Sequence, residues 1–163
     1  NQLNSIGAIE AGIKLGAVSL DHLETVTEEE IQMLGSYKGC STLLPTAAFF
    51  LRMPFQPARK LIDAGAAVTL ASDFNPGSSP SGNMNLVNAM SCIQMKMLPE
   101  EVINASTLNG AYAMELENEL GSITIGKAAN LIFTKPIPSL AYLFYSFGSN
   151  HIDKVMLKGN WVQ

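Results

Sequence analysis

The chain has 163 residues, of which 47% are hydrophobic and 15% charged, a composition typical of globular proteins and unlike that of charge-rich disordered segments. Its formal net charge of −4 argues against nucleic-acid binding, because no broad positive field attracts phosphate groups. No stretch reaches the roughly 18 apolar residues that span a bilayer, and no signal peptide pattern opens the sequence, so we expect a soluble cytoplasmic protein with no membrane partner.

The first part of the chain alternates between helical and strand-like patterns. Apolar side chains recur at helical spacing over residues 6–15, and the short apolar run 17–20 has the length of a buried parallel strand. Thr27 with Glu30 three positions later forms a capping box, which predicts a second helix ending at Gly35. One βα unit is therefore expected here.

Two more strands are predicted further along the chain. Residues 40–44 are strand-like and stop at Pro45, and residues 67–71 form another apolar run. Residues 57–64 between them suit a helix. Strands that alternate with helices indicate an α/β fold with a parallel sheet, in which ligands gather at the carboxyl ends of the strands.

Polar residues stand where two of these strands end. Asp21 and His22 follow the first strand, and Asp73 follows the third. Residues 74–82 then read Phe-Asn-Pro-Gly-Ser-Ser-Pro-Ser-Gly, which is too rich in Pro, Gly and Ser for regular structure and long enough to wrap a ligand. The sequence therefore predicts a functional edge of the sheet at these residues.

The remaining sequence divides into helices and a small β module. Residues 84–97 and 99–115 read as two helices that would cover the sheet, the second with Pro99 in its first turn. From Gly121 onwards the spacing of apolar residues becomes that of strands. Three strands are expected, at residues 122–125, 130–133 and 155–158.

Three segments carry a resemblance to a known family. They are Asp21-His22-Leu23-Glu24, Ser72-Asp73-Phe74-Asn75-Pro76-Gly77-Ser78, and Gly121-Ser122-Ile123 with Gly126-Lys127-Ala128-Ala129-Asn130-Leu131. In order and spacing they resemble the late part of the amidohydrolase superfamily, specifically the imidazolonepropionase family, over essentially the whole chain. The aspartate segment with its Asn-Pro-Gly-Ser extension is the most specific of the three. Asn130 departs from the pattern, since most relatives have Asp there, but it lies in the expected β module.

This resemblance implies a fold. The chain is expected to be the C-terminal part of a (β/α)8 metal-dependent hydrolase barrel, followed by strands of a small β-sandwich module. Residues 1–115 would supply βα units of the barrel, and residues 116–163 would belong to the β module. The chain also begins without Met and reads like the interior of a longer protein.

The resemblance also implies a metal site. Members of the family bind one zinc or iron ion through a His-x-His pair, a later histidine and an aspartate after the last barrel strand. Only the aspartate maps onto this sequence, at Asp73, and Asn1-Gln2-Leu3 resembles the residues directly after the later histidine. We therefore expect the chain alone to be inactive.

Asp73 and His22 are the expected catalytic residues. A carboxylate such as Asp73 at a strand end can bind the cation and accept a proton from its bound water, although an Asp there is also a common cap or turn residue. By the resemblance, His22 polarises the substrate carbonyl and is not a metal ligand. A buried histidine with a purely structural role is the alternative interpretation.

Four further residues are expected to bind substrate. Gln2 aligns with a position that hydrogen-bonds the substrate in relatives, and its amide can both donate and accept, although an exposed terminal Gln with no role is the alternative. Asn75, Gly77 and Ser78 would supply amide and backbone groups, with Gly77 permitting close approach of the main chain. Any turn has a similar composition, so the assignment of these three depends on the resemblance.

The resemblance also implies a reaction. The intact protein is expected to open the ring of 4-imidazolone-5-propanoate, giving N-formimidoyl-L-glutamate in histidine degradation, and to form a homodimer. One alternative is a non-catalytic fragment or interaction module. Another is a different cyclic amidohydrolase, against which the Asn75-Pro76-Gly77-Ser78 extension argues.

Overall fold

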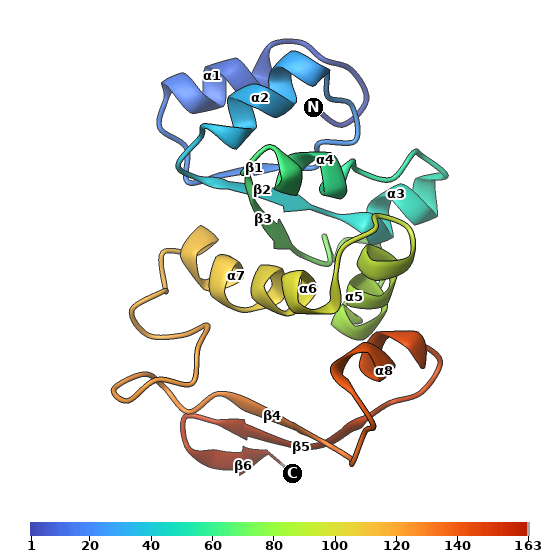
Figure 1. The fold of residues 1–163 in the computed structure, drawn as a ribbon, viewed down its shortest axis with the longest axis vertical. Coiled ribbons are helices and arrows are strands. Elements are labelled where there is room, and N and C mark those ends of the chain that lie inside the picture. Colours follow the sequence, from blue (N-terminus) through green and yellow to red (C-terminus); the bar gives the residue numbers. More distant parts are fainter. Residues whose placement is uncertain (163) are drawn as a thin grey trace.

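Two three-stranded sheets and the helices around them make up the computed structural model, which describes residues 1–162. In chain order the elements are α1 (Ala8–Lys14), β1 (Ser19–Asp21), α2 (Glu28–Gly35), β2 (Cys40–Leu43), α3 (Pro45–Leu51), α4 (Ala58–Asp63), β3 (Ala67–Leu70), α5 (Met84–Ile93), α6 (Pro99–Ser106), α7 (Leu108–Ala113), β4 (Leu131–Thr134), α8 (Leu140–Tyr145), β5 (Ile152–Leu157) and β6 (Asn160–Val162). Helices α1 and α2 lie at one end of the long axis, and the sheet of β4, β5 and β6 lies at the other (Figure 1). None of these helices is long and apolar enough to cross a membrane.

The first sheet is parallel, as the alternating pattern predicts. Strand β2 lies in the middle and pairs with β1 on one side and β3 on the other. Helices α1, α2 and α4 lie on one side of this sheet, and α6 and α7 lie on the other (Figure 1). Because it is covered in this way, all four residues of β2 are buried. Leu43 of β2 and Val68 of β3 belong to the main hydrophobic core.

Helix starts follow the local sequence. The expected capping box is confirmed at α2, where Glu30 N donates to Thr27 Oγ1 at 3.2 Å and Thr27 N donates to the Glu30 carboxylate at 2.8 Å. Pro45 ends the strand before it, as expected, but it also begins helix α3, which the sequence pattern did not predict. The run Pro-Thr-Ala-Ala-Phe-Phe-Leu lacks the polar positions that mark an amphipathic helix.

Three predictions from the second half of the sequence are wrong in detail. The helix expected at residues 84–97 ends at Ile93, and the one expected at 99–115 is two helices that meet at Thr107. Thr107 has φ −126° and ψ −79°, and its hydroxyl bonds the carbonyl of Ile103 at 2.6 Å, which interrupts the regular ladder. Residues 122–125 form no strand. Their isoleucines are almost fully exposed, so the alternating pattern has no partner to pair with.

The second sheet is antiparallel, in the order β4-β5-β6. The expected small β module is thus present, although residues 1–162 contain a single antiparallel sheet and not a complete sandwich. Helix α8, which the sequence analysis did not predict, lies between β4 and β5 and packs against α5 and α6. Its Phe144 is only 3% exposed and belongs to the main core.

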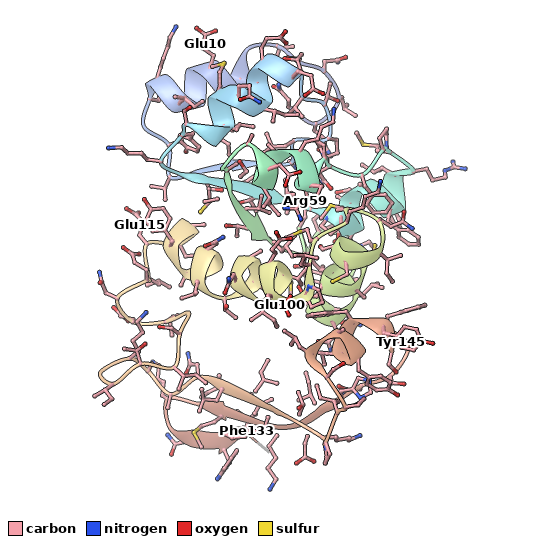
Figure 2. All side chains as sticks on the ribbon, in the orientation of Figure 1. Glu10, Arg59, Glu100, Glu115, Phe133 and Tyr145 are labelled. Atoms are coloured by element: carbon pink, nitrogen blue, oxygen red, sulfur yellow. The ribbon has the colours of Figure 1, made fainter. Side chains whose placement is uncertain are left out.

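An ion pair links the two helices α4 and α6. The guanidinium of Arg59 donates two hydrogen bonds of 2.9 Å to the two carboxylate oxygens of Glu101, and a third of 3.0 Å to Asp63. Figure 2 labels Arg59 on α4 and, on α6, Glu100, which directly precedes Glu101 in the sequence. Glu101 also accepts from the backbone N–H of Leu98, which caps α6. Arg59 lowers the pKa of the Glu101 carboxyl, with the Leu98 bond adding to this effect.

We therefore expect Arg59→Met to lower the free energy of unfolding by about 1 kcal/mol at pH 7, since the pair is bidentate but partly exposed. Because the folded state lowers the pKa of Glu101, this stabilisation exists above the unfolded pKa of about 4.3 and disappears as the pH falls through the lower folded value. Urea unfolding at pH 7 and pH 3 measures the difference. The exposed Arg52→Met is the control, and an equal loss in both variants at both pH values would contradict the prediction.

Candidate functional site

The carboxyl ends of β1 and β3 place His22 and Asp73 at the same edge of the parallel sheet. Both residues have left-handed backbones, with φ of 75° for His22 and 51° for Asp73, and Leu23 follows with φ 66°. Such conformations cost non-glycine residues roughly 1–3 kcal/mol each and persist where surrounding structure holds them, often at functional sites. Leu23 is fully buried and supplies that support beside His22.

The loop after Asp73 is held by the side chain of Asn75. Its Nδ2 donates to the carbonyl of Asp73 at 2.6 Å and to Ser78 Oγ at 2.9 Å, while its Oδ1 accepts from the backbone N–H groups of Gly77 and Ser78, both at 2.8 Å. The Ser78 hydroxyl lies 3.5 Å from Asp73 Oδ2. Asn75, Gly77 and Ser78 are thus brought together with Asp73, and their role in binding substrate stays a prediction. The amide of Asn75 is engaged within the loop, and it shapes the chain around the carboxylate.

The backbone just before Asp73 is fixed by two buried hydroxyl groups. The carbonyl of Ser72 accepts from Thr46 Oγ1 at 2.9 Å and from Ser79 Oγ at 2.6 Å. Thr46 is 4% exposed and Ser79 is 1% exposed. Because one hydroxyl comes from α3 and the other from the far end of the loop, these bonds restrict the orientation of the peptide that precedes Asp73.

His22 faces a buried carboxylate. Its Nδ1 lies 3.3 Å from Glu24 Oε1, and the exposed fractions of the two side chains are 26% and 1%. The same Glu24 oxygen accepts a 2.8 Å hydrogen bond from Gln56 Nε2, and Gln56 is 1% exposed. The His22 ring is therefore partly accessible at the sheet edge, and its Nδ1 side contacts the buried Glu24, which in turn bonds Gln56.

Gln2 lies beside the loop that follows β1. Its carbonyl accepts a 3.0 Å hydrogen bond from Thr25 Oγ1, and the backbone N–H of Thr25 donates to the carbonyl of Asn1 at 3.3 Å. These bonds join the first residues of the chain to the His22 loop. Gln2 is half-buried, and its role in binding substrate stays a prediction.

The candidate residues thus form two groups. Gln2 and His22 lie with the loop after β1, whereas Asn75, Gly77 and Ser78 lie with Asp73 after β3. Since β2 separates β1 from β3, the strands that lead to the two groups are roughly 10 Å apart, at roughly 4.8 Å per strand. A single substrate that contacts both groups must bridge the space between these two loops.

A metal ion would find one suitable ligand here. The carboxylate of Asp73 is half-buried at a strand end, which suits a ligand for zinc or iron. Within residues 1–162 there is no group of three His, Cys, Asp or Glu side chains that could hold a metal ion. A catalytic zinc site needs about three protein ligands, so Asp73 alone does not make one.

Several residues that support the site could not be recognised from the sequence. Glu24 is part of the Asp-His-Leu-Glu motif, but nothing in the motif indicates that its carboxylate turns back to the histidine. Gln56 reaches Glu24 across 32 residues of sequence and Thr46 reaches Ser72 across 26, and neither lies in a recognisable motif.

The chain is similar in sequence to known proteins over nearly its whole length. Residues 5–162 match the amidohydrolase family. The chain is 52% identical over 162 residues to the imidazolonepropionase of Christiangramia forsetii and 55% identical over 159 residues to that of Flavobacterium johnsoniae. These alignments cover 99% and 98% of the chain but 39% of each relative. The chain therefore spans about 39% of the length of the curated relatives that it matches.

Solved structures give the same arrangement at much lower identity. An adenosine deaminase from Xanthomonas campestris with bound zinc superposes with a TM-score of 0.78 at 23% identity, covering 91% of this chain and 38% of that one. The guanine deaminase of E. coli gives a TM-score of 0.74 at 19% identity, covering 89% and 38%. At such identities the likeness shows a shared fold.

Proposed function

The chain belongs to the amidohydrolase family, and on this premise we propose that the protein containing it is an imidazolonepropionase, which hydrolyses 4-imidazolone-5-propanoate to N-formimidoyl-L-glutamate. The observation that carries the proposal is Asp73 at the carboxyl end of β3 within its Asn-Pro-Gly-Ser loop. The identity of more than 50% with proteins of that name over nearly the whole chain supports it.

We assign the chain to the C-terminal part of such an enzyme. In this proposal β1, β2 and β3 are the last three strands of a (β/α)8 barrel, residues 1–115 supply its final βα units, and residues 116–163 supply strands of a β-sandwich module. The parallel order of the first sheet and the superposition on larger deaminases support the barrel. The single antiparallel sheet would form one layer of the sandwich.

We propose that Asp73 holds a catalytic zinc or iron ion together with histidines from the part of the relatives that this chain does not span. When bound, such an ion acidifies water and polarises a carbonyl group. Asp73 fits this role because its carboxylate follows a buried strand. The backbone around it is fixed, since Thr46 donates to the carbonyl of Ser72 and Asn75 donates to the carbonyl of Asp73. The zinc bound to a structurally similar deaminase supports a divalent metal ion at this site.

The proposed reaction adds the elements of water to the ring amide. Hydroxide attacks the carbonyl carbon, the ring C–N bond breaks, and the released nitrogen takes a proton. Asp73 would accept a proton from the attacking water and deliver it to that nitrogen. His22 would donate a hydrogen bond from its ring to the carbonyl oxygen as negative charge develops there.

Substrate binding is proposed for both groups at the sheet edge. The Gln2 amide can donate to and accept from an imidazolone ring. Asn75, Gly77 and Ser78 offer amide, backbone and hydroxyl groups, and some of their internal bonds would be exchanged for bonds to the substrate. We further propose, from the family resemblance, a cytoplasmic enzyme that acts as a homodimer.

Assay of the full-length, metal-loaded protein tests this function. We expect it to form N-formimidoyl-L-glutamate from 4-imidazolone-5-propanoate with a kcat within the usual range of about 1–10³ s⁻¹. Product formation can be followed by mass spectrometry. The 163-residue chain alone should be inactive, since Asp73 is its one expected ligand. A metal-loaded protein that is inactive, or that prefers another cyclic amide, would overturn the assignment.

A further inference from the structure

The His22–Glu24–Gln56 cluster contains a carboxylate that the reaction above does not use. Glu24 lies two residues after His22, and the consecutive left-handed residues His22 and Leu23 turn the chain so that the carboxylate faces the ring. Leu23 is fully buried and anchors this turn in the core. The local backbone conformation therefore serves to bring Glu24 against Nδ1 of His22.

Burial of Glu24 is unfavourable by itself. Its side chain is 1% exposed, one oxygen bonds only Gln56 and the His22 ring, and Oε2 has no hydrogen-bond partner among the described residues. Removing a carboxylate from water is costly unless charge and hydrogen bonds compensate. Replacing buried charged groups with apolar side chains of similar size is often neutral or stabilising, so stability gives no reason for a carboxylate at this position.

The placement is explained by what a carboxylate does to a histidine ring. A hydrogen bond from Nδ1–H to a carboxylate fixes the tautomer and the orientation of the ring. The other ring nitrogen, Nε2, lies on the opposite side of the ring, and it donates a hydrogen bond in the form of the ring that carries a proton on both nitrogens. The distance of 3.3 Å between Nδ1 and the Glu24 carboxylate is longer than the roughly 2.7–2.9 Å of charge-assisted bonds.

We propose that Glu24 is the positioning residue of His22, and that Gln56 holds the Glu24 carboxylate in place from the segment before α4. This proposal rests on the proposed function for the role of His22 as a donor to the substrate carbonyl. Glu24 itself does not touch the substrate. It keeps the His22 ring oriented, while the bond from Gln56 keeps one carboxylate oxygen directed at the ring.

The test uses two nearly isosteric variants of the full-length, metal-loaded protein. Glu24→Gln removes the negative charge beside His22 with little change in shape. The double variant Glu24→Gln/Gln56→Glu exchanges the two side chains, which keeps a buried Glu–Gln hydrogen bond but moves the carboxylate away from the ring. We expect both variants to lose about 10²-fold in kcat with KM changed less than about threefold, as for loss of a group that acts in the transition state.

A matched control is Glu117→Gln. Glu117 also has a buried carboxylate oxygen without a partner, but it lies outside the sheet edge, and its variant should keep kcat within about twofold. Recovery of kcat in the exchanged double variant would show that Glu24 serves only the buried pair, and it would overturn the proposal. A kcat near that of the native protein in Glu24→Gln would do the same.

A second measurement is independent of turnover. In the protein labelled with ¹⁵N-histidine, the ring signals that vanish in His22→Asn belong to His22, and their shifts report which nitrogen carries a proton. We expect native His22 to carry a proton on Nδ1, facing Glu24, and Glu24→Gln to change the ring shifts. Ring shifts unchanged by Glu24→Gln would refute the positioning role, even if the protein proves to act on another substrate.

Discussion

Replacing Asp73 by Asn is expected to abolish most activity of the full-length enzyme, with kcat/KM lowered at least about 10³-fold, because a metal ion contributes several kcal/mol to the transition state. The amide of Asn is a weaker ligand than a carboxylate and accepts no proton from water. The fold should change little, since Asn is nearly isosteric with Asp and favours the same left-handed backbone, here at φ 51°.

Metal content and activity together decide this prediction. Elemental analysis of the purified variant should show less than full occupancy, and the residual turnover should stay low when excess metal is added. Asp153→Asn, which alters an exposed carboxylate of β5, is the control and should behave like the native protein. Full metal occupancy combined with near-normal turnover in Asp73→Asn would remove Asp73 from the site.

Replacing His22 by Asn or Ala is expected to leave the metal in place and lower kcat by about 10²–10³, the scale of losing one donor to a developing oxyanion. The reason is the position of His22 at the end of β1, where its ring is partly exposed and held by Glu24. His151→Asn is the control, because His151 packs against Tyr142 in another part of the structure, with ring centroids 5.4 Å apart.

Parallel measurement of metal and rate separates this role from its alternative. If metal is lost in proportion to activity, His22 is a ligand and the division of labour with Asp73 is wrong. If neither changes, the histidine is structural. Retained metal with lost turnover is the expected signature of a residue that polarises the carbonyl.

Much of the first sheet could be predicted because its signals are local. Each predicted strand is a short apolar run, and the Thr27–Glu30 capping box fixes the start of α2 within a few residues of sequence. Helix α8 could not be predicted because its six residues, Leu-Ala-Tyr-Leu-Phe-Tyr, have no polar face. The packing of Phe144 into the core, which the sequence does not reveal, favours the helix. The opposite error occurs at residues 122–125, where the alternating pattern predicts a strand but no partner strand lies beside it.

Candidate site residues could be proposed from the sequence where a polar residue follows a strand within a motif. Asp73 and His22 follow strands and lie in motifs, so both could be proposed from the sequence. The hydroxyl of Thr46 and the amide of Gln56 could not, because each meets its partner only after folding brings distant segments together. The positive φ of His22, Leu23 and Asp73 was equally hidden, since none is a glycine that would signal it.

Helix α8 ties the antiparallel sheet into the rest of the molecule. The chain leaves the helical layer after α7, forms β4, returns through α8 to bury Phe144 against α5 and α6, and only then forms β5 and β6. Separating this sheet would withdraw an aromatic side chain from the core, at a cost of about 2–3 kcal/mol. We therefore expect the sheet and the βα units to unfold together. With a shorter connection between β4 and β5 that lacks α8, the sheet would lose its packing against α5 and α6.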